Sequence, residues 1–434
     1  MNLQLTDDDQ AKLDGAAGAG VAMAMRMVVA LARVMQADRL IDIASAHIDG
    51  CLYHGQAGLD FAERLVALGA RVTVPTTLNV SSLDLLHPGL VRLPPADAVA
   101  ARRLMDAYVA LGARSTWTCA PYQESDRPAQ GSDIAWAESN AIVFANSALG
   151  ARTERYGDFI DVCAAITGRV PYAGLHVPAR RVPTIAVDCS AIPSRVLDGE
   201  AAWAALGHAV GARVASGIPL LTGIDERVVD EDRLKAFGAA AASAGGVALF
   251  HVESVTPEAR DADPAWAHGI AGIALSTADL RAARDQLTTA IAPEQLDAVS
   301  LGTPHMSLSE FAKLAAESTA GGLTTGGLAS EAVARPFHPD CTVWISTSRS
   351  VLAEARERGY VEIVERFGAR IVVDTCTYLV PILGENVRTV MTTSGKWAWY
   401  APTNLGVDVV FGTLAECVAS ARAGRVVRDD AAWE

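Results

Sequence analysis

Three cysteines stand where a side chain could reach a cleft and bind a metal. Cys119 lies in the polar loop TCAPYQ, Cys341 lies in FHPDCTVW at the entrance to an expected strand, and Cys376 ends the expected strand RIVVDTC. None of them belongs to a C-x-x-C pair, the spacing that would mark a metal site strongly. The chain has seven cysteines, an odd number that does not indicate a disulfide framework in a chain of this size. Thiol, thiolate and metal-ligand roles therefore remain open.

Ser394 and Lys396 stand together in TTSGK. In a turn that contains glycine, backbone NH groups and an ammonium could orient an anion. The chain has four lysines, and Lys396 is the only one after residue 313. This isolation favours a functional role for Lys396 over the alternative of an ordinary surface lysine.

Two other side chains could move a proton. His47 stands in SAHID at an expected strand end, where it could transfer a proton, bond a substrate or be a satisfied structural histidine. Glu138 stands in a segment that is expected to be helical, one turn before Ile142. It could carry a proton or bind a metal, or it could have a buried structural partner, as a glutamate among apolar residues requires.

Several polar residues could bind a small acidic substrate. Arg152, in GARTER, suits a carboxylate because a guanidinium offers paired donors, whereas capping a helix or pairing with Glu154 is the structural alternative. The other candidates are hydroxyl, amide and imidazole groups in expected loops and strand ends, namely Ser45, Thr77, Asn79, Asn140 and His305.

Alternating strands and helices would position these residues. An expected strand at 39–48, a helix at 56–70 and a strand at 71–79 form a βαβ pattern. The pattern recurs with expected parallel strands at 343–345 and 371–373 around one helix. Ligands of open α/β sheets collect at the carboxyl ends of strands. The candidates that fall at such ends are Ser45, His47, Thr77, Asn79 and Cys376.

Composition and charge exclude several classes of protein. With 434 residues, half of them hydrophobic, the chain can bury a large core and is expected to form two or three domains. Its 36 basic and 50 acidic residues give a net charge of −14, so nucleic acid is not an expected partner. The polar N-terminus predicts no export signal, and Arg26 and Arg33 interrupt the apolar segment 18–40. We therefore expect a cytoplasmic protein that does not enter a membrane.

Long motifs occur in order between about residues 40 and 420. They are SAHIDG, VTVPTTLN, TCAPY, GSDIAWAESNAIVFANSALGARTERYGD, AITGRVPYAGLH, FHVESVTPEA, GTPHMSLSEF, FHPDC, VVDTC, TTSGKWAWY and FGTLAECV. Together they resemble the catalytic domain of the aconitase X family. Motifs of this length and order do not recur by chance.

The resemblance implies an α/β, aconitase-like fold in which several α/β domains surround a central iron-sulfur site. The region covers residues 1–434 and would comprise two or three subdomains. The cluster ligands would be Cys119, Cys341 and Cys376. The cofactor would be a 2Fe-2S, 3Fe-4S or 4Fe-4S iron-sulfur cluster or a mononuclear iron. In GTPHMS the family often has cysteine where this chain has Thr303, so position 303 is left out of the ligand set.

The resemblance also implies a hydro-lyase, a dehydratase of a small hydroxy acid. The expected reaction converts cis-3-hydroxy-L-proline to 1-pyrroline-2-carboxylate, and dehydration of mevalonate 5-phosphate or of a related hydroxy acid is the alternative. Ser394, Lys396, His47 and Glu138 would serve catalysis. An alternative of another class is a non-catalytic iron-sulfur sensor or binding protein. The joint presence of Ser394, Lys396, Arg152 and the three cysteines disfavours it.

Aconitase X enzymes resemble aconitase in having a smaller, swivelling domain that closes over the site. The chain stops after FGTLAECVASARAGRVVRDDAAWE, where the large part of such enzymes ends. We therefore expect the small domain on a separate chain and a heteromer, a heterodimer or a larger assembly, in which this chain is the large subunit.

Overall fold

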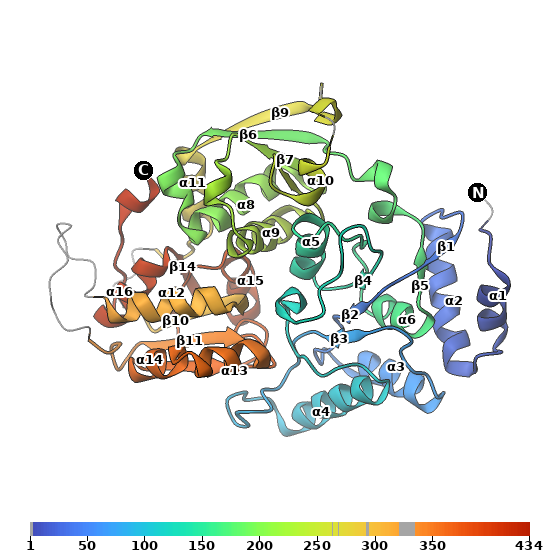
Figure 1. Ribbon diagram of the computed structural model, residues 1–434. Coiled ribbons are helices and arrows are strands. Elements are labelled where there is room, and N and C mark those ends of the chain that lie inside the picture. The colour runs from blue at the N-terminus through green and yellow to red at the C-terminus, as the bar shows by residue number, and fades with distance from the viewer. Residues whose placement is uncertain (1–2, 263, 268, 292–294, 321–334) are drawn as a thin grey trace.

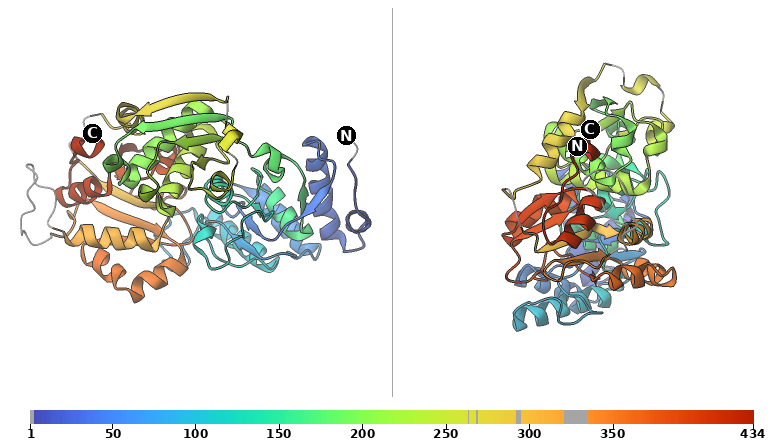
Figure 2. Two further views of the ribbon diagram at one scale, coloured as in Figure 1. Left: turned by 45° about the horizontal axis from the view of Figure 1, so that its top comes forward. Right: turned by 90° about the vertical axis from the view of Figure 1, so that its left-hand side faces the viewer.

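The computed structural model describes residues 3–262, 264–267, 269–291, 295–320 and 335–434 (Figure 1). The protein is of the mixed α/β class, and its larger sheets are parallel. Figure 2 shows the middle region, in green and yellow, above the C-terminal region, in orange and red, in both views. The largest hydrophobic core contains residues of the N-terminal, middle and C-terminal regions, among them Cys119, Trp203 and Cys376. Cys119 and Cys376 therefore lie where the three regions meet.

The N-terminal region carries a three-stranded parallel sheet in the order β3-β2-β4. Its strands are β2 (Ala46–Ile48), β3 (Thr76–Leu78) and β4 (Ala135–Trp136). A separate antiparallel pair joins β1 (Leu40–Asp42) to β5 (Arg169–Pro171). The helices of this region are α1 (Asp7–Asp14), α2 (Ala19–Val34), α3 (Gln56–Ala67), α4 (Pro95–Ala110), α5 (Ser139–Ser147) and α6 (Ile160–Thr167).

No single helix in the described ranges is long and apolar enough to cross a membrane. Taken together, α1 and α2 would be long and apolar enough, but the chain bends by 120° between them.

The middle region carries a four-stranded parallel sheet in the order β8-β7-β6-β9. Its strands are β6 (Ile185–Ala191), β7 (Pro219–Thr222), β8 (His251–Val252) and β9 (Ala271–Ser276). Its helices are α7 (Ser194–Leu197), α8 (Glu200–Val214), α9 (Glu231–Gly245), α10 (Pro257–Arg260) and α11 (Thr277–Gln286). Helices α8 and α9 lie below the sheet in Figure 1, on the side that faces the rest of the molecule.

The C-terminal region carries a five-stranded parallel sheet in the order β12-β11-β10-β13-β14. Its strands are β10 (Ala298–Met306), β11 (Thr342–Thr347), β12 (Ala369–Val372), β13 (Thr389–Thr392) and β14 (Asp408–Phe411). Its helices are α12 (Leu308–Thr319), α13 (Arg349–Glu357), α14 (Tyr360–Arg366), α15 (Gly395–Leu405) and α16 (Leu414–Ala423).

The first predicted βαβ unit differs from the structure in its strands. The expected strand 39–48 is two strands, β1 and β2, because the backbone changes partners between them: Ile43 donates to Gly168 and Ala44 donates to Asp133. Of segment 71–79, only Thr76–Leu78 is a strand. Pro75 stops its extension, since proline has no NH for the ladder. The expected helix is confirmed as α3.

The two parallel strands of the second predicted unit are confirmed, but the prediction of one connecting helix is wrong. β11 and β12 are parallel neighbours, with Val343 beside Ala369 and Ser346 beside Val372. Two helices connect them instead of one. The break falls at Gly359, whose φ of +75° favours a residue without a side chain and ends the first helix.

Small residues allow α8 and α9 to pack in backbone contact. A Cβ added at Gly207 of α8 would lie 2.2 Å from the carbonyl oxygen of Phe237 in α9. A Gly207→Ala variant is therefore expected to lose roughly 1–3 kcal/mol of unfolding free energy, as overpacked core positions do. The matched control is Gly58→Ala in α3, where no atom lies within 4 Å and alanine should stabilise the helix by roughly 0.5–1 kcal/mol. Urea unfolding of both variants measures the difference, and equal midpoints would contradict the close helix contact.

Candidate active site

The carboxyl ends of β2, β3 and β4 meet at one edge of the N-terminal sheet. The register places His47 between Thr77 and Trp136. Beyond the strand ends, Asp49 follows β2, Asn79 follows β3 and Glu138 follows β4. The Asn79 amide donates to Oδ1 of Asp49, so the side chains after β2 and β3 lie in contact. This edge faces the C-terminal region, which contributes Cys376 and Lys396.

Two of the predicted cysteines come together at this place. Ligand atoms of Cys119, Cys376 and His305 all lie within 4.8 Å of one another, and all three residues are buried. The neighbouring Cys119 thiol and burial raise the pKa of Cys376 well above its ordinary value. Among the described residues, this is the group of cysteine, histidine and carboxylate side chains whose spacing could hold a metal ion. The structure therefore brings Cys119 and Cys376 together across two regions of the chain.

An ion pair two residues before Cys376 holds that cysteine in place. Arg349 donates twice to the Asp374 carboxylate, at 2.6 Å each. The same carboxylate accepts the Leu85 NH, and the Asp374 carbonyl accepts the Ser81 NH at 2.6 Å. Asp374 has a φ of +63°, an uncommon conformation for a residue with a side chain. The N-terminal region is thus docked against the end of β12, where Cys376 begins the turn.

His305, predicted to bind substrate, is instead tied into the protein by both ring nitrogens. Nε2 donates to the Thr375 carbonyl at 3.2 Å, and Nδ1 pairs with the Thr118 hydroxyl at 3.0 Å. Burial lowers the pKa of His305 to about 4, so the ring is neutral near pH 7. The backbone NH of His305 donates to Sγ of Cys119 at 3.3 Å. His305 therefore orients the thiol site more readily than it ligates, because ligation would break one of these bonds.

The donors present fit a metal group held through two thiolates. Cys119 and Cys376 supply soft sulfur ligands of the kind that iron-sulfur groups require. Thr303, two residues before His305, is buried, and its hydroxyl has no hydrogen-bond partner among the described residues. The side chains whose spacing could hold such a group are therefore the two thiols and His305.

A buried ion pair lies beside the thiols. The Lys396 ammonium contacts Oε1 of Glu138 and lies 3.2 Å from the Ser139 hydroxyl. Both partners are about 6% exposed. Burial alone would lower the pKa of Lys396, but Glu138 raises it well above its ordinary value. Burial alone would raise the pKa of Glu138, but Lys396 and Asn140 hold it below its ordinary value. Both side chains are therefore charged near neutral pH.

Glu138 was expected inside a helix and stands at its beginning. It is the N-cap of α5, and its carboxylate accepts the NH groups of Asn140 and Ala141 at 3.0 and 3.1 Å. Its φ is +73°, so the backbone adopts a strained conformation at this position. A carboxylate with this many donors is fixed in place and held ionised.

Asn140, predicted to bind substrate, has both amide hydrogens committed inside the protein. Nδ2 donates to the Cys119 carbonyl at 2.6 Å and to the Glu138 carboxylate. Oδ1 accepts the Tyr122 hydroxyl at 2.5 Å. Asn140 therefore connects the thiol loop to the ion pair and offers no free NH to a substrate.

His47 has one ring nitrogen without a partner among the described residues, and Ser394 lines a small cavity beside Lys396. Burial lowers the pKa of His47 to about 3, so its ring is neutral. Nδ1 lies 2.8 Å from the Thr77 hydroxyl, and Nε2 has no partner among the described residues. Ser394 caps α15 by accepting the Trp397 NH at 3.0 Å. With Lys396 it lines a cavity of about 30 Å³, which is enough for one water.

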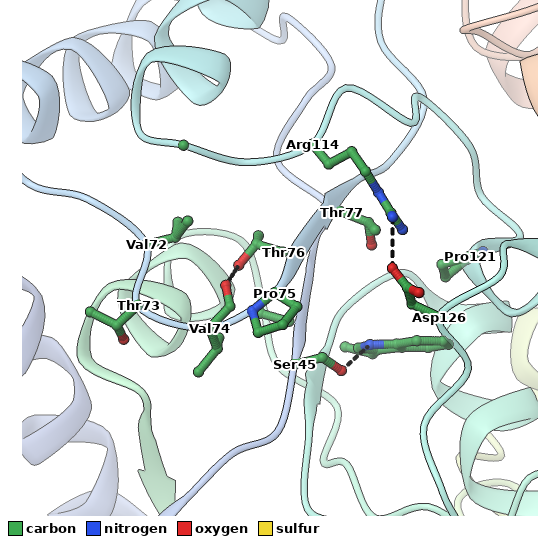
Figure 3. A pocket seen from close by; sticks show the side chains of 13 residues that line it. Ser45, Val72, Thr73, Val74, Pro75, Thr76, Thr77, Arg114, Pro121 and Asp126 are labelled. Carbon is green, nitrogen blue, oxygen red and sulfur yellow. Dashed lines mark hydrogen bonds and ion pairs between the residues drawn. The ribbon is translucent and has the colours of Figure 1, made fainter.

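Ser45 and Thr77 line a separate pocket of about 410 Å³ (Figure 3). The Trp136 indole donates to the Ser45 hydroxyl at 3.2 Å, and Arg114 pairs with Asp126 at 2.7 Å across the pocket. The Thr77 hydroxyl reaches His47, so this pocket borders the candidate site through one side chain. Direct contact of Ser45 and Thr77 with a substrate at Lys396 stays a prediction.

Two predicted residues are not brought to this site. The backbone of Arg152 forms an isolated β-bridge with Asp133, before β4, whereas Glu138 follows β4, and five residues of extended chain span roughly 16 Å. The Arg152 side chain lies beside Gly131, and burial together with the charge of Arg152 lowers the pKa of Arg181. The prediction of Arg152 as a substrate clamp is therefore corrected.

Cys341 is the second correction. It precedes β11 at the amino end of the sheet, whereas Cys376 follows β12 at the carboxyl end, and the two strands are parallel. Cys341 packs in the hydrophobic core of the C-terminal region, separate from the core that holds Cys119 and Cys376. The predicted set of three cysteine ligands is not assembled in the described structure.

Asp49 and Tyr122 belong to the site and were not predicted. Both belong to motifs that hold predicted site residues, SAHIDG with His47 and TCAPYQ with Cys119. A polar residue directly after an expected strand could have identified Asp49 by the same reasoning that identified Asn79. Tyr122 had no such signal, because its role depends on a partner 18 residues away.

Comparisons with known proteins agree with this architecture. Models of the aconitase X first, second and third domains match residues 2–179, 183–285 and 296–423. The crystal structure of Thermococcus kodakaraensis aconitase X in its holo-form superposes with a TM-score of 0.83 at 32% identity, covering 96% of this chain and 100% of that chain.

Two curated relatives are dehydratases. The cis-3-hydroxy-L-proline dehydratase of Pseudomonas aeruginosa is 42% identical over 433 residues, 98% of this chain and 71% of that protein. The phosphomevalonate dehydratase large subunit of Methanothermobacter thermautotrophicus is 35% identical over 400 residues, 92% of this chain and 94% of that protein.

Proposed function

This chain belongs to the aconitase X family, and from that premise we propose that it is a hydro-lyase that converts cis-3-hydroxy-L-proline to 1-pyrroline-2-carboxylate. The observation that carries the proposal is the convergence of the Cys119 and Cys376 thiols with the buried Lys396–Glu138 pair at one edge of a parallel sheet. A dehydratase needs an electrophile for the departing hydroxyl and positive charge for the substrate carboxylate. The 42% identity to a hydroxyproline dehydratase supports the choice of substrate.

We assign Cys119 and Cys376 to an iron-sulfur group. When bound, that group would supply a Lewis acid to the departing hydroxyl. His305 would hold the Cys119 sulfur through its backbone NH, and Asn140 would hold the Cys119 carbonyl. Reduced thiols persist in a reducing compartment, so we place the reaction in the cytoplasm.

Lys396 has the chemistry to bind the substrate carboxylate. Removing the proton on the adjacent carbon spreads negative charge onto that carboxylate, and a fixed ammonium stabilises this charge in a buried site more than in water. Glu138 keeps the Lys396 ammonium charged and fixes its position. Ser394 caps α15 so that Lys396 lies in its first turn, where the free NH groups of the helix also favour an anion.

Charge pairing favours an amino acid over a phosphorylated substrate. A cleft of about 670 Å³ near Tyr122 is lined by three cations, Arg127, Lys235 and Lys313. Each is paired with a carboxylate: Arg127 with Glu231 at 2.7 Å, Lys235 with Glu310 and Lys313 with Glu200. A phosphate would have to displace several of these carboxylates at once, whereas a substrate carboxylate would share one cation, Lys396, with Glu138. Mevalonate 5-phosphate is the second candidate, because the chain spans 94% of a phosphomevalonate dehydratase large subunit but 71% of a hydroxyproline dehydratase.

The same alignment supports a partner. Since the chain matches a protein named a large subunit over nearly its whole length, we propose that a small subunit completes the site and forms a heteromer with this chain.

Anaerobic coexpression with a candidate small subunit tests these proposals together. We expect iron and sulfide to copurify, and we expect turnover of cis-3-hydroxy-L-proline only when both chains are present. The assay compares this compound with mevalonate 5-phosphate at equal concentration. Preferred turnover of the phosphate would overturn the substrate, and full activity of this chain alone would overturn the partner.

A further inference from the structure

Two carboxyl groups at the edge of the N-terminal sheet have opposite surroundings. Glu138 accepts two backbone NH groups, the Asn140 amide and the Lys396 ammonium. Its lone pairs are occupied, and it contacts a cation. Asp49, which follows the neighbouring strand β2, has no ion pair with a cation among the described residues. In enzymes that use two carboxyls, such a difference in surroundings separates the group that stays ionised from the group that moves a proton.

The backbone of Asp49 is held rigidly while part of its side chain stays free. The Asp161 carboxylate, which is fully buried, accepts the Asp49 NH at 2.7 Å. Close packing fixes the next residue too, because a Cβ at Gly50 would lie 3.0 Å from the Tyr108 hydroxyl. On the side chain, Asn79 donates to Oδ1. Oδ2 has no hydrogen-bond partner among the residues that the structure describes, so it is the atom available to a ligand.

We propose that Asp49 is a catalytic acid of the dehydration, and that its Oδ2 delivers the proton that leaves with the substrate hydroxyl as water. The inference rests on the proposed function and deepens it. Asp49 lies at the same strand edge as Glu138 and within charge range of both Glu138 and Lys396. The register that pairs His47 with Trp136 puts Asp49 and Glu138 at matching positions after neighbouring strands. A substrate whose carboxylate meets Lys396, the partner of Glu138, would therefore lie on the Asp49 side of the site.

The surroundings of Asp49 keep a proton on it. Burial and the negative charges of Glu138, Asp158 and Asp161 raise the pKa of Asp49 to about 8, although Lys396 opposes the shift. The carboxyl is therefore protonated at pH 7 and loses its proton as the pH rises through about 8. His47, with a pKa of about 3, has no proton to give as an imidazolium.

The proposed step balances with a separate base. In cis-3-hydroxy-L-proline the hydroxyl and the carboxylate share one face of the ring, so the hydroxyl and the hydrogen on the neighbouring carbon lie on opposite faces. A Brønsted base on the far face takes that hydrogen, and its bonding electrons form the double bond. The carbon–oxygen bond breaks with its electrons on oxygen, and Asp49 protonates that oxygen to give water. The product of this step is the C2=C3 enamine, which loses a proton from nitrogen and gains one at C3 from solvent to give 1-pyrroline-2-carboxylate. Solvent then returns the proton from the base to Asp49.

The test separates proton removal from hydroxyl loss in the complex of both chains. In an Asp49→Asn variant in D₂O, we expect elimination to fall by at least about 10²-fold, the usual contribution of a general acid. The base is unaffected, so exchange of the C2 hydrogen of cis-3-hydroxy-L-proline for deuterium should continue. Equal losses of exchange and elimination would show that Asp49 only maintains the structure of the site. Unchanged elimination would show that Asp49 takes no part in the reaction. Either result overturns the proposal.

Asp158→Asn is the matched variant. Asp158 is an exposed neighbour that contributes negative charge to Asp49. Its removal should lower the pKa of Asp49, so the alkaline fall in turnover should move to lower pH while the rate at the optimum stays unchanged. An unmoved alkaline limb would count against Asp49 as the titrating acid.

A readout that needs no substrate separates this proposal from the proposed function. Infrared spectra at pH 7 should contain a protonated-carboxyl band that Asp49→Asn removes. If the parent complex turns over neither compound, the proposed function fails, and the band still decides whether Asp49 holds a proton. A parent spectrum without that band overturns the inference even if the enzyme is active.

Discussion

A Lys396→Met variant is expected to lose roughly 10²–10³-fold in turnover, the usual effect of removing a buried group that stabilises developing negative charge. Methionine keeps much of the side-chain volume and removes the ammonium. The same change leaves the Glu138 carboxylate buried without its cation, so we also expect a loss of roughly 3–5 kcal/mol of unfolding free energy. Steady-state kinetics and urea unfolding measure the two effects on one preparation.

The double variant Lys396→Met with Glu138→Gln separates catalysis from stability. Neutralising both partners removes the unpaired buried charge, so most of the lost unfolding free energy should return. Turnover should stay low, because the ammonium is still missing. If the double variant regained activity together with stability, Lys396 would be a structural residue only. Lys12→Met is the matched control, since Lys12 forms a partly exposed pair with Asp8 at 2.8 Å, and such pairs contribute about 0–1 kcal/mol.

The parts of the site that could be predicted from the sequence are those that follow from strand polarity. Asn79, His47 and Cys376 were placed by one argument, that side chains at the carboxyl ends of parallel strands collect at the edge of a sheet. Asn79 follows β3 and Cys376 follows β12, each at the carboxyl edge of its own sheet, whereas His47 lies within β2. The prediction of Cys341 as a cluster ligand was wrong, and strand polarity explains why. Cys341 precedes its strand, so strand polarity places it at the opposite edge, and its resemblance to a cluster ligand does not change that position.

Contacts between distant segments could not be predicted in this way. Glu138 and Lys396 are 258 residues apart, and no local pattern indicates that the N-cap of α5 faces the first turn of α15. Lys396 was identified from its glycine-containing turn and from the rarity of lysine in the chain. Asn140 was recognised as a polar group, but its role depends on Tyr122 and Cys119, which the fold brings to it.

Cys376→Ala is expected to abolish retention of the metal group, whereas Cys341→Ala should leave it intact. Cys376 and Cys119 are the two thiols whose sulfur atoms lie together, and a group held by two thiolates loses half of its protein sulfur ligands when one is removed. We expect iron per chain to fall by more than about tenfold after anaerobic purification, since even indirect changes around metal ligands weaken binding by 10–100-fold. Turnover should fall with it.

The comparison with Cys341→Ala excludes a general loss of folding. Cys341 is 4% exposed and Cys376 is 1% exposed, so both substitutions remove a sulfur atom from a buried position and create a small cavity of similar cost. Iron content, sulfide content and thermal unfolding are measured on both variants and the parent. Loss of iron in the Cys341 variant at unchanged stability would restore the three-cysteine ligand set and require the C-terminal sheet to rearrange. Iron retained by the Cys376 variant would instead move the metal group away from the Lys396–Glu138 pair, and with it the electrophile that the proposed dehydration requires.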